Sequence, residues 1–268
     1  MITISIVLYN HTIEEIKPLV STLHQSKAVK FIYLIDNSPS SNIEFRKLPA
    51  IYIFTGKNLG YGSAHNIAIE KSIMQGIKYH IVLNPDIILN SNVIEQLTEY
   101  MELHQEVGLS MPNIVYPNLH RQYLCKLLPS PSDLIFRRFN PFERIKRKHD
   151  DWFELKNANY NTAFYAPSLS GCFMFIRTDV LLKVNGFDEH FFMYCEDIDL
   201  CRRINKIAEL RYVPTEYVIH QYNKESYKEI KLLRSHINSA IKYFNKWGWI
   251  FDSDRRKINK KTLKQLKL

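Results

Sequence analysis

Short apolar runs alternate with helical patterns along the first third of the chain, and this alternation constrains the fold more than any other feature. β-Branched and other apolar residues fill 2–8, 29–35, 51–54 and 81–83. Apolar residues recur at helical spacing over 13–23, 63–75 and 93–104. Apolar strands separated by helices are typical of a mostly parallel sheet that is covered on both faces. The sequence therefore predicts an α/β fold in which a mostly parallel sheet is flanked by helices.

Polar side chains follow three of these runs, at the points where the strands should end. Tyr9 and Asn10 follow the first run, Asp36 follows the second, and the fourth leads into Asn84 and Asp86. In open α/β sheets, ligands bind beyond the carboxyl ends of the strands. Asparagine, aspartate and proline are also ordinary turn formers, which is the simpler explanation for each turn taken alone. Together with the acidic segment described below, the three ends favour a ligand site at this edge.

A glycine-rich segment, Gly56 to Gly62, lies between the third strand and the next helix. Its glycines allow close approach of a backbone or a ligand, and the N-terminus of the following helix suits an anion. The segment lacks both the phosphate-loop pattern and the full dinucleotide fingerprint. By itself it therefore predicts no specific ligand.

The segment from Gly186 to Asp199 sets five carboxylates among aromatic residues and then enters an amphipathic helix. Glu196, Asp197 and Asp199 fall in or near the first turn of that helix. A carboxylate that aromatic neighbours shield from water can have its pKa moved towards working pH and act as a general base. Acids also favour helix N-termini because they complement the helix dipole. For this segment alone, the two explanations carry about equal weight.

The remaining elements are less regular. The region 117–167 shows little periodicity and mixes prolines with aromatic and basic residues, so we expect it to cover the site or to contact an acceptor. Further elements are expected as a buried strand at 171–176, a short helix at 180–184, a strand at 217–219 ending at His220, and a final helix at 227–247.

The formal net charge of +9 is concentrated in two basic runs, 137–148 and 254–268. Such runs are usually solvated faces. In the second run, Ile258, Leu263 and Leu266 lie among the lysines, which is also compatible with an interfacial helix attracted to anionic lipid. No nucleic-acid recognition motif accompanies this charge, so nucleic acid is not expected as a partner.

The sequence also contains features that indicate the cellular compartment of the protein. No apolar run approaches the ~20 residues that span a bilayer, and the N-terminus lacks a basic leader, so we expect no secretion signal. The four cysteines show no metal-ligand spacing and suit reduced thiols in a cytoplasmic protein. Cys195 and Cys201 are expected to be packing residues.

Taken in order, the motifs resemble those of glycosyltransferase family 2, whose members have the GT-A fold. The resemblance covers about residues 1–222 and rests on Tyr9-Asn10, Asp36-Asn37-Ser38, Asn58-Leu59-Gly60 with Asn66, Asn84-Pro85-Asp86, Ser170-Gly171, Gly186-Phe187-Asp188-Glu189 and the block from Phe192 to Arg202. Within the family, this last block is most similar to bacterial rhamnosyltransferases of surface-polysaccharide assembly.

The resemblance implies a nucleotide-sugar site along the first half of the chain. The implied donor-binding residues are Tyr9, Asn10 and Asp36 around the pyrimidine base, Asn58, Gly60 and Asn66 along the ribose and diphosphate, and Asn84 at the far end. Arg202 or Arg203 could stabilise the leaving diphosphate. We prefer pairing with Asp199, on the same helix, for at least one of these two arginines.

The resemblance also implies how the reaction is catalysed. Asp197 would be the catalytic base, with Glu196 beside it. Asp86 would reach a divalent metal, Mg²⁺ or Mn²⁺, and His220 lies where some relatives place a further ligand, although a lone histidine after a strand is as readily a structural hydrogen-bonder. The usual metal motif has carboxylates at both ends, whereas here the first is Asn84, a weaker ligand for a hard cation. Strict metal dependence is therefore in doubt.

The implied function is an inverting transfer of a sugar, L-rhamnose from dTDP-rhamnose, to a lipid-linked glycan acceptor at the cytoplasmic face of the membrane. Alternatives are a galactofuranose, glucose or N-acetylhexosamine donor, a degenerate member that binds nucleotide without turnover, and a non-catalytic protein that binds anionic surfaces. The expected domains are a GT-A domain at 1–222, with a nucleotide-binding half at 1–90 and an acceptor and catalytic half at 91–222, and a C-terminal helix and basic tail at 223–268.

Overall fold

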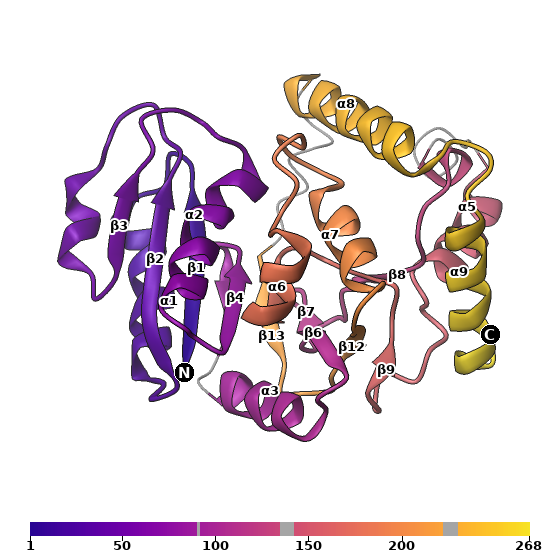
Figure 1. The fold of residues 1–268 in the computed structure, drawn as a ribbon, viewed down its shortest axis with the longest axis horizontal. Coiled ribbons are helices and arrows are strands. Elements are labelled where there is room, and N and C mark those ends of the chain that lie inside the picture. Colours follow the sequence, from indigo (N-terminus) through magenta and orange to yellow (C-terminus); the bar gives the residue numbers. More distant parts are fainter. Residues whose placement is uncertain (90–91, 135–141, 222–229) are drawn as a thin grey trace.

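The computed structural model describes residues 1–89, 92–134, 142–221 and 230–268 (Figure 1). Its centre is an eight-stranded sheet with the strand order β3-β2-β1-β4-β11-β6-β12-β9. These strands are β1 (Ile2–Leu8), β2 (Val29–Asp36), β3 (Ile51–Phe54), β4 (Tyr79–Leu83), β6 (Val107–Met111), β9 (Phe164–Tyr165), β11 (Phe173–Arg177) and β12 (Glu209–Tyr212). Two small sheets contain β8 (Cys125–Lys126) with β10 (Ser168–Leu169), and β5 (Ile87–Ile88), β13 (Val218–His220) and β7 (Ile114–Val115).

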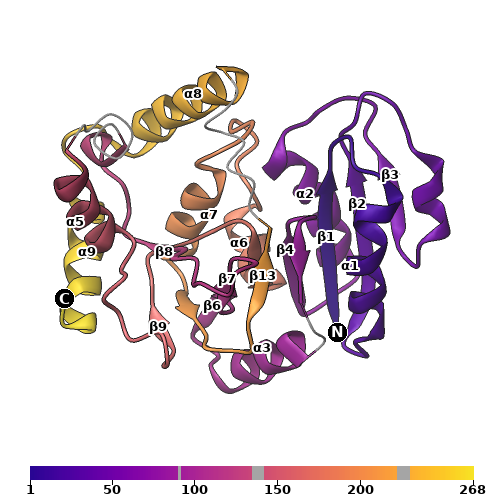
Figure 2. The same ribbon diagram turned by 180° about the vertical axis from the view of Figure 1, so that it is seen from behind.

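Helices cover both faces of the sheet and extend beyond it. They are α1 (Ile13–Gln25), α2 (Tyr61–Met74), α3 (Asn92–Leu103), α5 (Glu143–Phe153), α6 (Thr178–Val184), α7 (Glu196–Ile204), α8 (Ile230–Trp247), α9 (Ser253–Leu266) and the 3-10 helix η1 (Ile43–Lys47). In both views α8 lies along the outer edge of the molecule and α9 runs beside α5, far from β3 (Figures 1 and 2).

The first four strands are parallel, as the alternation predicts. The even-numbered residues of β1 bury one face against α1, which contributes Ile16 and Leu19. On the other face, Ala64 and Ala68 of α2 pack against Ile35 of β2. Small residues at these two positions let the helix approach the sheet closely. The predicted fold class is confirmed.

The antiparallel strand β11 connects the two halves of the sheet. It pairs with β4 on one side and β6 on the other, with Phe173 opposite Leu83. The register continues past the strand ends, because the N–H of Asn84 donates to the carbonyl of Cys172 at 2.9 Å. This pairing brings the 170–172 turn next to the polar residues that follow β4.

Several elements lie where the sequence shows no clear pattern. β6 and β12 were not predicted, and the region 117–167 contains β8, α5 and β9. The first part of the basic run, 137–141, and the start of the final predicted helix, 227–229, lie outside the described residues. The division at residue 222 therefore stays a prediction.

The basic tail forms α9, and its apolar side faces the protein. Leu263 and Leu266 pack against the main core, and Thr262 is fully buried. These leucines are therefore not free to enter lipid, and contact of the tail with an anionic membrane stays a prediction. The outward-facing basic residues are Arg256, Lys257, Lys260, Lys261, Lys264 and Lys267. Of the helices among the described residues, none has the length and apolar character needed to cross a membrane.

Candidate active site

The carboxyl ends of β1 and β2 meet at the predicted edge of the sheet. Leu8 lies opposite Asp36 in this parallel pair, and the Asp36 side chain is buried. Its Oδ1 accepts a hydrogen bond from the N–H of Ser38 at 3.0 Å, and its Oδ2 accepts one from the Tyr52 hydroxyl at 2.6 Å. Asp36 is therefore fixed in orientation as an acceptor at the end of the strand.

Tyr52 is a site residue that sequence reasoning missed. Burial, followed by the hydrogen bond to Asp36, raises the pKa of Tyr52 to about 12. The hydroxyl therefore remains a donor at neutral pH. Because Phe54 lies opposite Asp36, Tyr52 projects from the same face of β3 two positions earlier. The pairing of β2 with β3 would have identified Tyr52 as a neighbour of Asp36, but the sequence does not reveal this pairing.

Tyr9 and Asn10 lie beside Asp36, as expected. Tyr9 is 49% exposed, which leaves its ring accessible at the end of β1. Asn10 has a φ of 57°, a left-handed conformation that asparagine tolerates better than most residues. Its N–H donates to Ser38 Oγ at 2.8 Å, so the turns after β1 and β2 are joined.

Gly60 must be glycine because the 187–192 segment approaches it closely. Its φ is +85°, and a Cβ at this position would lie 2.2 Å from the carbonyl oxygen of Phe192. That carbonyl accepts a hydrogen bond from the N–H of Tyr61 at 2.9 Å, at the start of α2. Asn58 Oδ1 accepts from the Gly60 N–H at 2.9 Å. The glycine-rich segment thus joins the donor side of the site to the acidic segment.

Asn66 has a different role from the one expected. Its Oδ1 accepts from the N–H of Phe187 at 2.8 Å, and its Nδ2 donates to the carbonyl of the same residue at 2.9 Å. The side chain is buried. Both ends of the amide are thus used to hold the turn after Gly186, in place of the ribose or diphosphate contact that the resemblance implied.

Asn84 is engaged on both sides of its amide. Its Oδ1 accepts a hydrogen bond from the Tyr61 hydroxyl at 2.9 Å, and its Nδ2 lies 3.4 Å from His220 Nε2. The Tyr61 hydroxyl also lies 2.7 Å from the carbonyl oxygen of Gly171. Tyr61, which sequence reasoning did not single out, therefore bridges the end of β4 and the turn before β11.

Asp86 and His220 lie together, as the resemblance implies for a metal site. His220 Nε2 is 3.4 Å from Asp86 Oδ1, and this oxygen has no hydrogen-bond partner. Nδ1 of His220 is 2.9 Å from Gln122 Oε1, which orients the ring with Nε2 towards Asp86. Burial lowers the pKa of His220, but contacts with Asp86 and then Cys172 outweigh it and raise the pKa to about 10.

This pair fits a divalent cation only in part. An outer hydrogen bond that orients a histidine, such as the one from Gln122, is typical of metal ligands. Among the described residues, however, no group of three or more histidine, cysteine, aspartate or glutamate side chains gathers as a cation site would. A metal held by Asp86 and His220 would need further oxygen ligands, and a donor diphosphate carries them.

The acidic turn before α7 has an unusual backbone. Tyr194 and Cys195 have φ values of 70° and 64°, although neither is a residue that favours the left-handed region. Such local strain is concentrated at functional sites in proteins. The turn places Asp197 beside Gly171, whose N–H donates to Asp197 Oδ2 at 3.1 Å. The N–H of Ile198 donates to Oδ1 at 2.8 Å.

Glu196 and Asp197 are adjacent carboxylates in contrasting surroundings. Glu196 is buried, and its Oε2 has no hydrogen-bond partner. Burial, and then the charge of Asp197, raises the pKa of Glu196 to about 8. Glu196 is therefore protonated at neutral pH. Asp197 is partly exposed, and its two oxygens accept hydrogen bonds from the N–H groups of Gly171 and Ile198, so of the two side chains Asp197 is the more accessible to an acceptor.

Both arginines of α7 are committed to structural contacts. Arg203 Nε is 2.7 Å from Asp199 Oδ2, so the preferred pairing is confirmed for this residue. Arg202 is buried, pairs with Asp252 and lies 4.3 Å from the centroid of the Trp247 ring. Neither guanidinium is therefore available to a leaving diphosphate.

Helix α8 holds the acidic turn from outside. Ser239 Oγ donates to the carbonyl of Met193 at 2.7 Å, and Trp247 Nε1 donates to Asp199 Oδ1 at 2.8 Å. Lys246 reaches Asp188 at 2.6 Å and Asp199 at 2.7 Å. The sequence places these residues about fifty positions from their partners, and no local pattern predicts the contacts.

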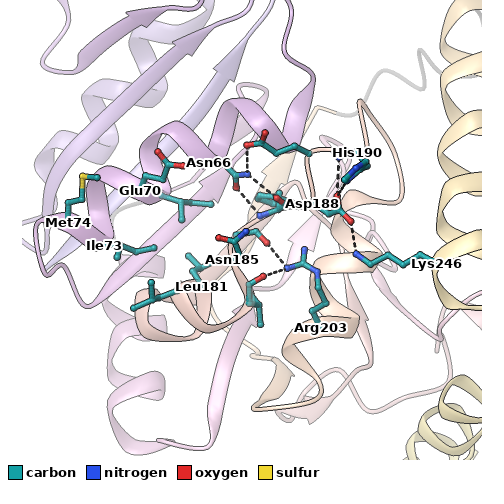
Figure 3. A pocket seen from close by; sticks show the side chains of 16 residues that line it. Asn66, Glu70, Ile73, Met74, Leu181, Asn185, Asp188, His190, Arg203 and Lys246 are labelled. Carbon is teal, nitrogen blue, oxygen red and sulfur yellow. Dashed lines mark hydrogen bonds and ion pairs between the residues drawn. The ribbon is translucent and has the colours of Figure 1, made fainter.

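A separate cavity lies apart from this site. It has a volume of about 580 Å³ and is lined by the outer side of α2, α6 and the 185–190 turn (Figure 3). Of the expected site residues, Asn66 alone lines it. Figure 3 shows Asn66 hydrogen-bonded to that turn, with Arg203 and Lys246 on the opposite side.

Comparison with solved structures decides the fold. GalNAc-T7, crystallised with UDP, GalNAc and Mn²⁺, matches 82% of this chain and 44% of its own with a TM-score of 0.60 at 15% identity. S. aureus TarS in complex with UDP matches 98% of this chain and 70% of its own with a TM-score of 0.58 at 13% identity. This chain has the GT-A glycosyltransferase fold. At such low identity, these two likenesses establish the fold alone.

Curated relatives of this GT-A chain are glycosyltransferases. It is 28% identical over 253 residues to rhamnosyltransferase WbbL of Escherichia coli, covering 91% of this chain and 92% of that protein. It is 28% identical over 207 residues to an N-acetylglucosaminyl-diphospho-decaprenol L-rhamnosyltransferase of Mycobacterium tuberculosis, covering 69% of this chain and 62% of that enzyme. No family profile matches the chain. The predicted resemblance to rhamnosyltransferases is confirmed.

Proposed function

We propose that this GT-A chain is an inverting transferase that moves L-rhamnose from dTDP-rhamnose to a hydroxyl group of a lipid-linked glycan. The rhamnosyltransferase relatives support the sugar and the class of acceptor. The site supports the chemistry, because Asp36, a fixed hydrogen-bond acceptor, and the carboxylate of Asp197 lie at the same edge of the sheet. The activity belongs to bacterial surface-polysaccharide synthesis.

One series of connected hydrogen bonds is the main support for the proposal. The backbone N–H of Gly171 donates to Asp197, and the Tyr61 hydroxyl lies within hydrogen-bond distance of both the Gly171 carbonyl and Asn84 Oδ1, which share its proton. The carboxylate expected to act as base is thus joined, through two residues, to the motif expected to face the donor. Such a connection holds reacting groups in fixed relative positions, which is a large part of enzymatic rate enhancement.

In the proposed reaction, an acceptor hydroxyl attacks the anomeric carbon of the donor. Asp197 takes the hydroxyl proton as the new carbon–oxygen bond forms. The bond between the anomeric carbon and the diphosphate breaks, and the diphosphate leaves with the electron pair. A single displacement inverts the anomeric configuration. A divalent cation at Asp86 and His220 would supply positive charge to the leaving diphosphate.

The donor assignment is tested by a thermal-shift panel of nucleotide sugars with and without Mn²⁺. A ligand at ~100 times its dissociation constant adds ~2.7 kcal/mol to the stability of the folded protein. We expect the largest shift for dTDP-rhamnose, with a further increase when Mn²⁺ is present. A larger shift with a UDP-hexose would mean that this sugar nucleotide, and not dTDP-rhamnose, is the donor. Transfer that is unchanged in excess chelator would remove the metal from the proposal.

The acceptor implies a place of action at the cytoplasmic face of the membrane, with the protein bound peripherally. The six outward-facing basic residues of α9 support such contact, because each basic group near an anionic leaflet contributes about 1 kcal/mol. Since the leucines of this helix are packed against the protein, any apolar contact with lipid must come from another part of the chain.

A further inference from the structure

The outward side of α8 and the corner that follows it carry exposed apolar side chains. Ile237 and Ile241 lie one helical turn apart and are 48% and 41% exposed. Beyond the end of the helix, Trp249, Ile250 and Phe251 are 44%, 67% and 90% exposed. We call these five residues the α8 corner surface.

The residues of the α8 corner surface follow one side of the helix and the turn after it. Asn245 stands one turn after Ile241 on the same side of the helix, and its Oδ1 accepts a hydrogen bond from Trp249 Nε1 at 2.8 Å. The indole is thus held against the end of the exposed stripe. In both views the helix and its corner form the outer edge of the molecule (Figures 1 and 2).

The exposed apolar residues are not a misplaced part of the core, because α8 has a second apolar side. Tyr243 and Phe244 are buried with Phe191 and Cys195 beneath the helix. The helix therefore packs on the protein with one side and presents isoleucines on the other. Contiguous exposed apolar surface of this kind marks an interaction site.

Basic residues surround the corner. Lys242 is exposed on α8, and Arg256 donates to the carbonyl of Ile250 at 3.1 Å. Lys257 and Lys260 follow on α9 and are also exposed. Between Trp249 and the C-terminus the acids are Asp252, which is buried, and Asp254, which is exposed in the first turn of α9 and is outnumbered by the basic residues. An aromatic and aliphatic tip within a basic ring is complementary to an anionic surface with an apolar interior.

We propose that the α8 corner surface docks on an anionic lipid bilayer, with Trp249, Ile250 and Phe251 entering the boundary between headgroups and acyl chains. This inference deepens the proposed function, on which it rests for the lipid-linked acceptor. A second copy of the chain fits this surface less well, because a symmetric contact would bring two basic rings together.

The α8 corner surface lies close to the acidic turn before α7. Ser239, in the middle of α8, binds the carbonyl of Met193. At 1.5 Å per residue, only about 12 Å of helix separates Ser239 from the start of the corner. Docking through the corner would therefore hold the acidic turn near the membrane surface, where a lipid-linked acceptor presents its glycan.

The test compares two double variants in sedimentation with vesicles of equal parts phosphatidylcholine and phosphatidylglycerol. Ile250→Ser with Phe251→Ser removes the tip, whereas Met74→Ser with Leu103→Ser removes apolar residues that are 83% and 74% exposed elsewhere. We expect the tip variant to lose about tenfold or more in vesicle partitioning, because a buried apolar side chain contributes strongly to transfer from water. The control should bind as the parent does. Equal binding by both double variants would overturn the proposal.

Further measurements distinguish lipid from a second copy of the chain as the occupant of the surface, and they separate the docking proposal from the proposed function. Brominated lipid should quench the tryptophan fluorescence of the parent but much less that of Trp249→Phe. A parent dimer that the tip variant dissociates would assign the surface to a second copy and overturn lipid docking. Transfer to a water-soluble acceptor analogue should persist in the tip variant. If vesicles bind but no donor is turned over, the proposed function fails and the docking surface stands.

Discussion

Two buried carboxyl groups on opposite sides of the site are held in contrasting ways. Asp36, at the end of β2, has a hydrogen bond to each oxygen, from Ser38 and from Tyr52. Glu196, at the start of α7, has an oxygen with no partner. The proposed donor side is thus built from regular strand ends, whereas the proposed catalytic side holds a carboxyl group at an energetic cost.

The backbone shows the same difference. Asp36 ends a strand in regular parallel register, but Glu196 follows two consecutive left-handed residues, Tyr194 and Cys195. Strained backbone persists only where its surroundings hold it. Here α8 supplies the support, through Ser239 to the Met193 carbonyl. The acidic turn therefore depends on a distant part of the chain, whereas Asp36 is held by Ser38 and Tyr52, which are close to it in sequence.

The largest expected effect is a loss of turnover from a substitution at Asp197, on the proposed catalytic side. Asp197→Asn should lower turnover by about 10²–10⁴-fold, because an amide cannot accept the acceptor proton. Donor affinity should stay near that of the parent, as measured by calorimetric titration. Asp179→Asn is the matched control, since Asp179 is also an acid in the first turn of a helix but is exposed. A variant at Asp197 that kept most of its turnover would remove this residue from the role of base.

The second effect concerns the junction of the two sides. Gly60→Ala would place a Cβ 2.2 Å from the Phe192 carbonyl oxygen. We expect a loss of about 1–3 kcal/mol of stability from overpacking, beyond the backbone strain, together with a raised KM for the donor. Gly56→Ala has a similar positive φ but no atom within 4 Å, so it should show the strain alone. Equal melting temperatures for the two variants would contradict the close approach.

The third effect belongs to the donor side. Asp36→Ala should weaken nucleotide binding by about 1–3 kcal/mol, because a fixed acceptor is lost and its buried donors are left unpaired. Tyr52→Phe keeps the carboxylate and should cost less. Titration with the nucleoside diphosphate measures both. If Asp36→Ala bound the nucleotide as tightly as the parent, the end of β2 would be only a turn.

The smallest effect is a pH dependence on the catalytic side. The folded-state pKa of Glu196 is raised to about 8 from an ordinary value of 4.5. Stability from this group is therefore complete below pH 4.5 and falls as pH rises towards 8, because the unfolded chain releases the proton first. Glu196→Gln cannot ionise and should melt higher than the parent at pH 8–9, by on the order of a few °C. The difference should shrink near pH 5. A difference that is constant across this range would show that Glu196 is not held protonated.

Local patterns in the sequence determined the parallel half of the sheet, β1 to β4, and the position of its polar edge. The period of the apolar residues predicts β1 to β4 with α1 and α2, because burial on a sheet face or a helix side requires that spacing. The polar strand ends at Asp36 and Asn84, and the acids at the start of α7, follow from the same reading. These features depend on residues that are neighbours along the chain.

Only the tertiary structure decided what each polar side chain binds. Asn66 turns to Phe187, 121 residues away, and Arg202 pairs with Asp252, 50 residues away. Tyr61 joins Asn84 to Gly171. A hydrogen bond needs its two atoms within about 3 Å in a suitable direction, and chain packing sets that geometry for residues so far apart. The sequence therefore indicated the edge of the sheet where polar residues gather, whereas the packing brought in Tyr52 and Tyr61 and committed Asn66 and Arg202 to structural contacts.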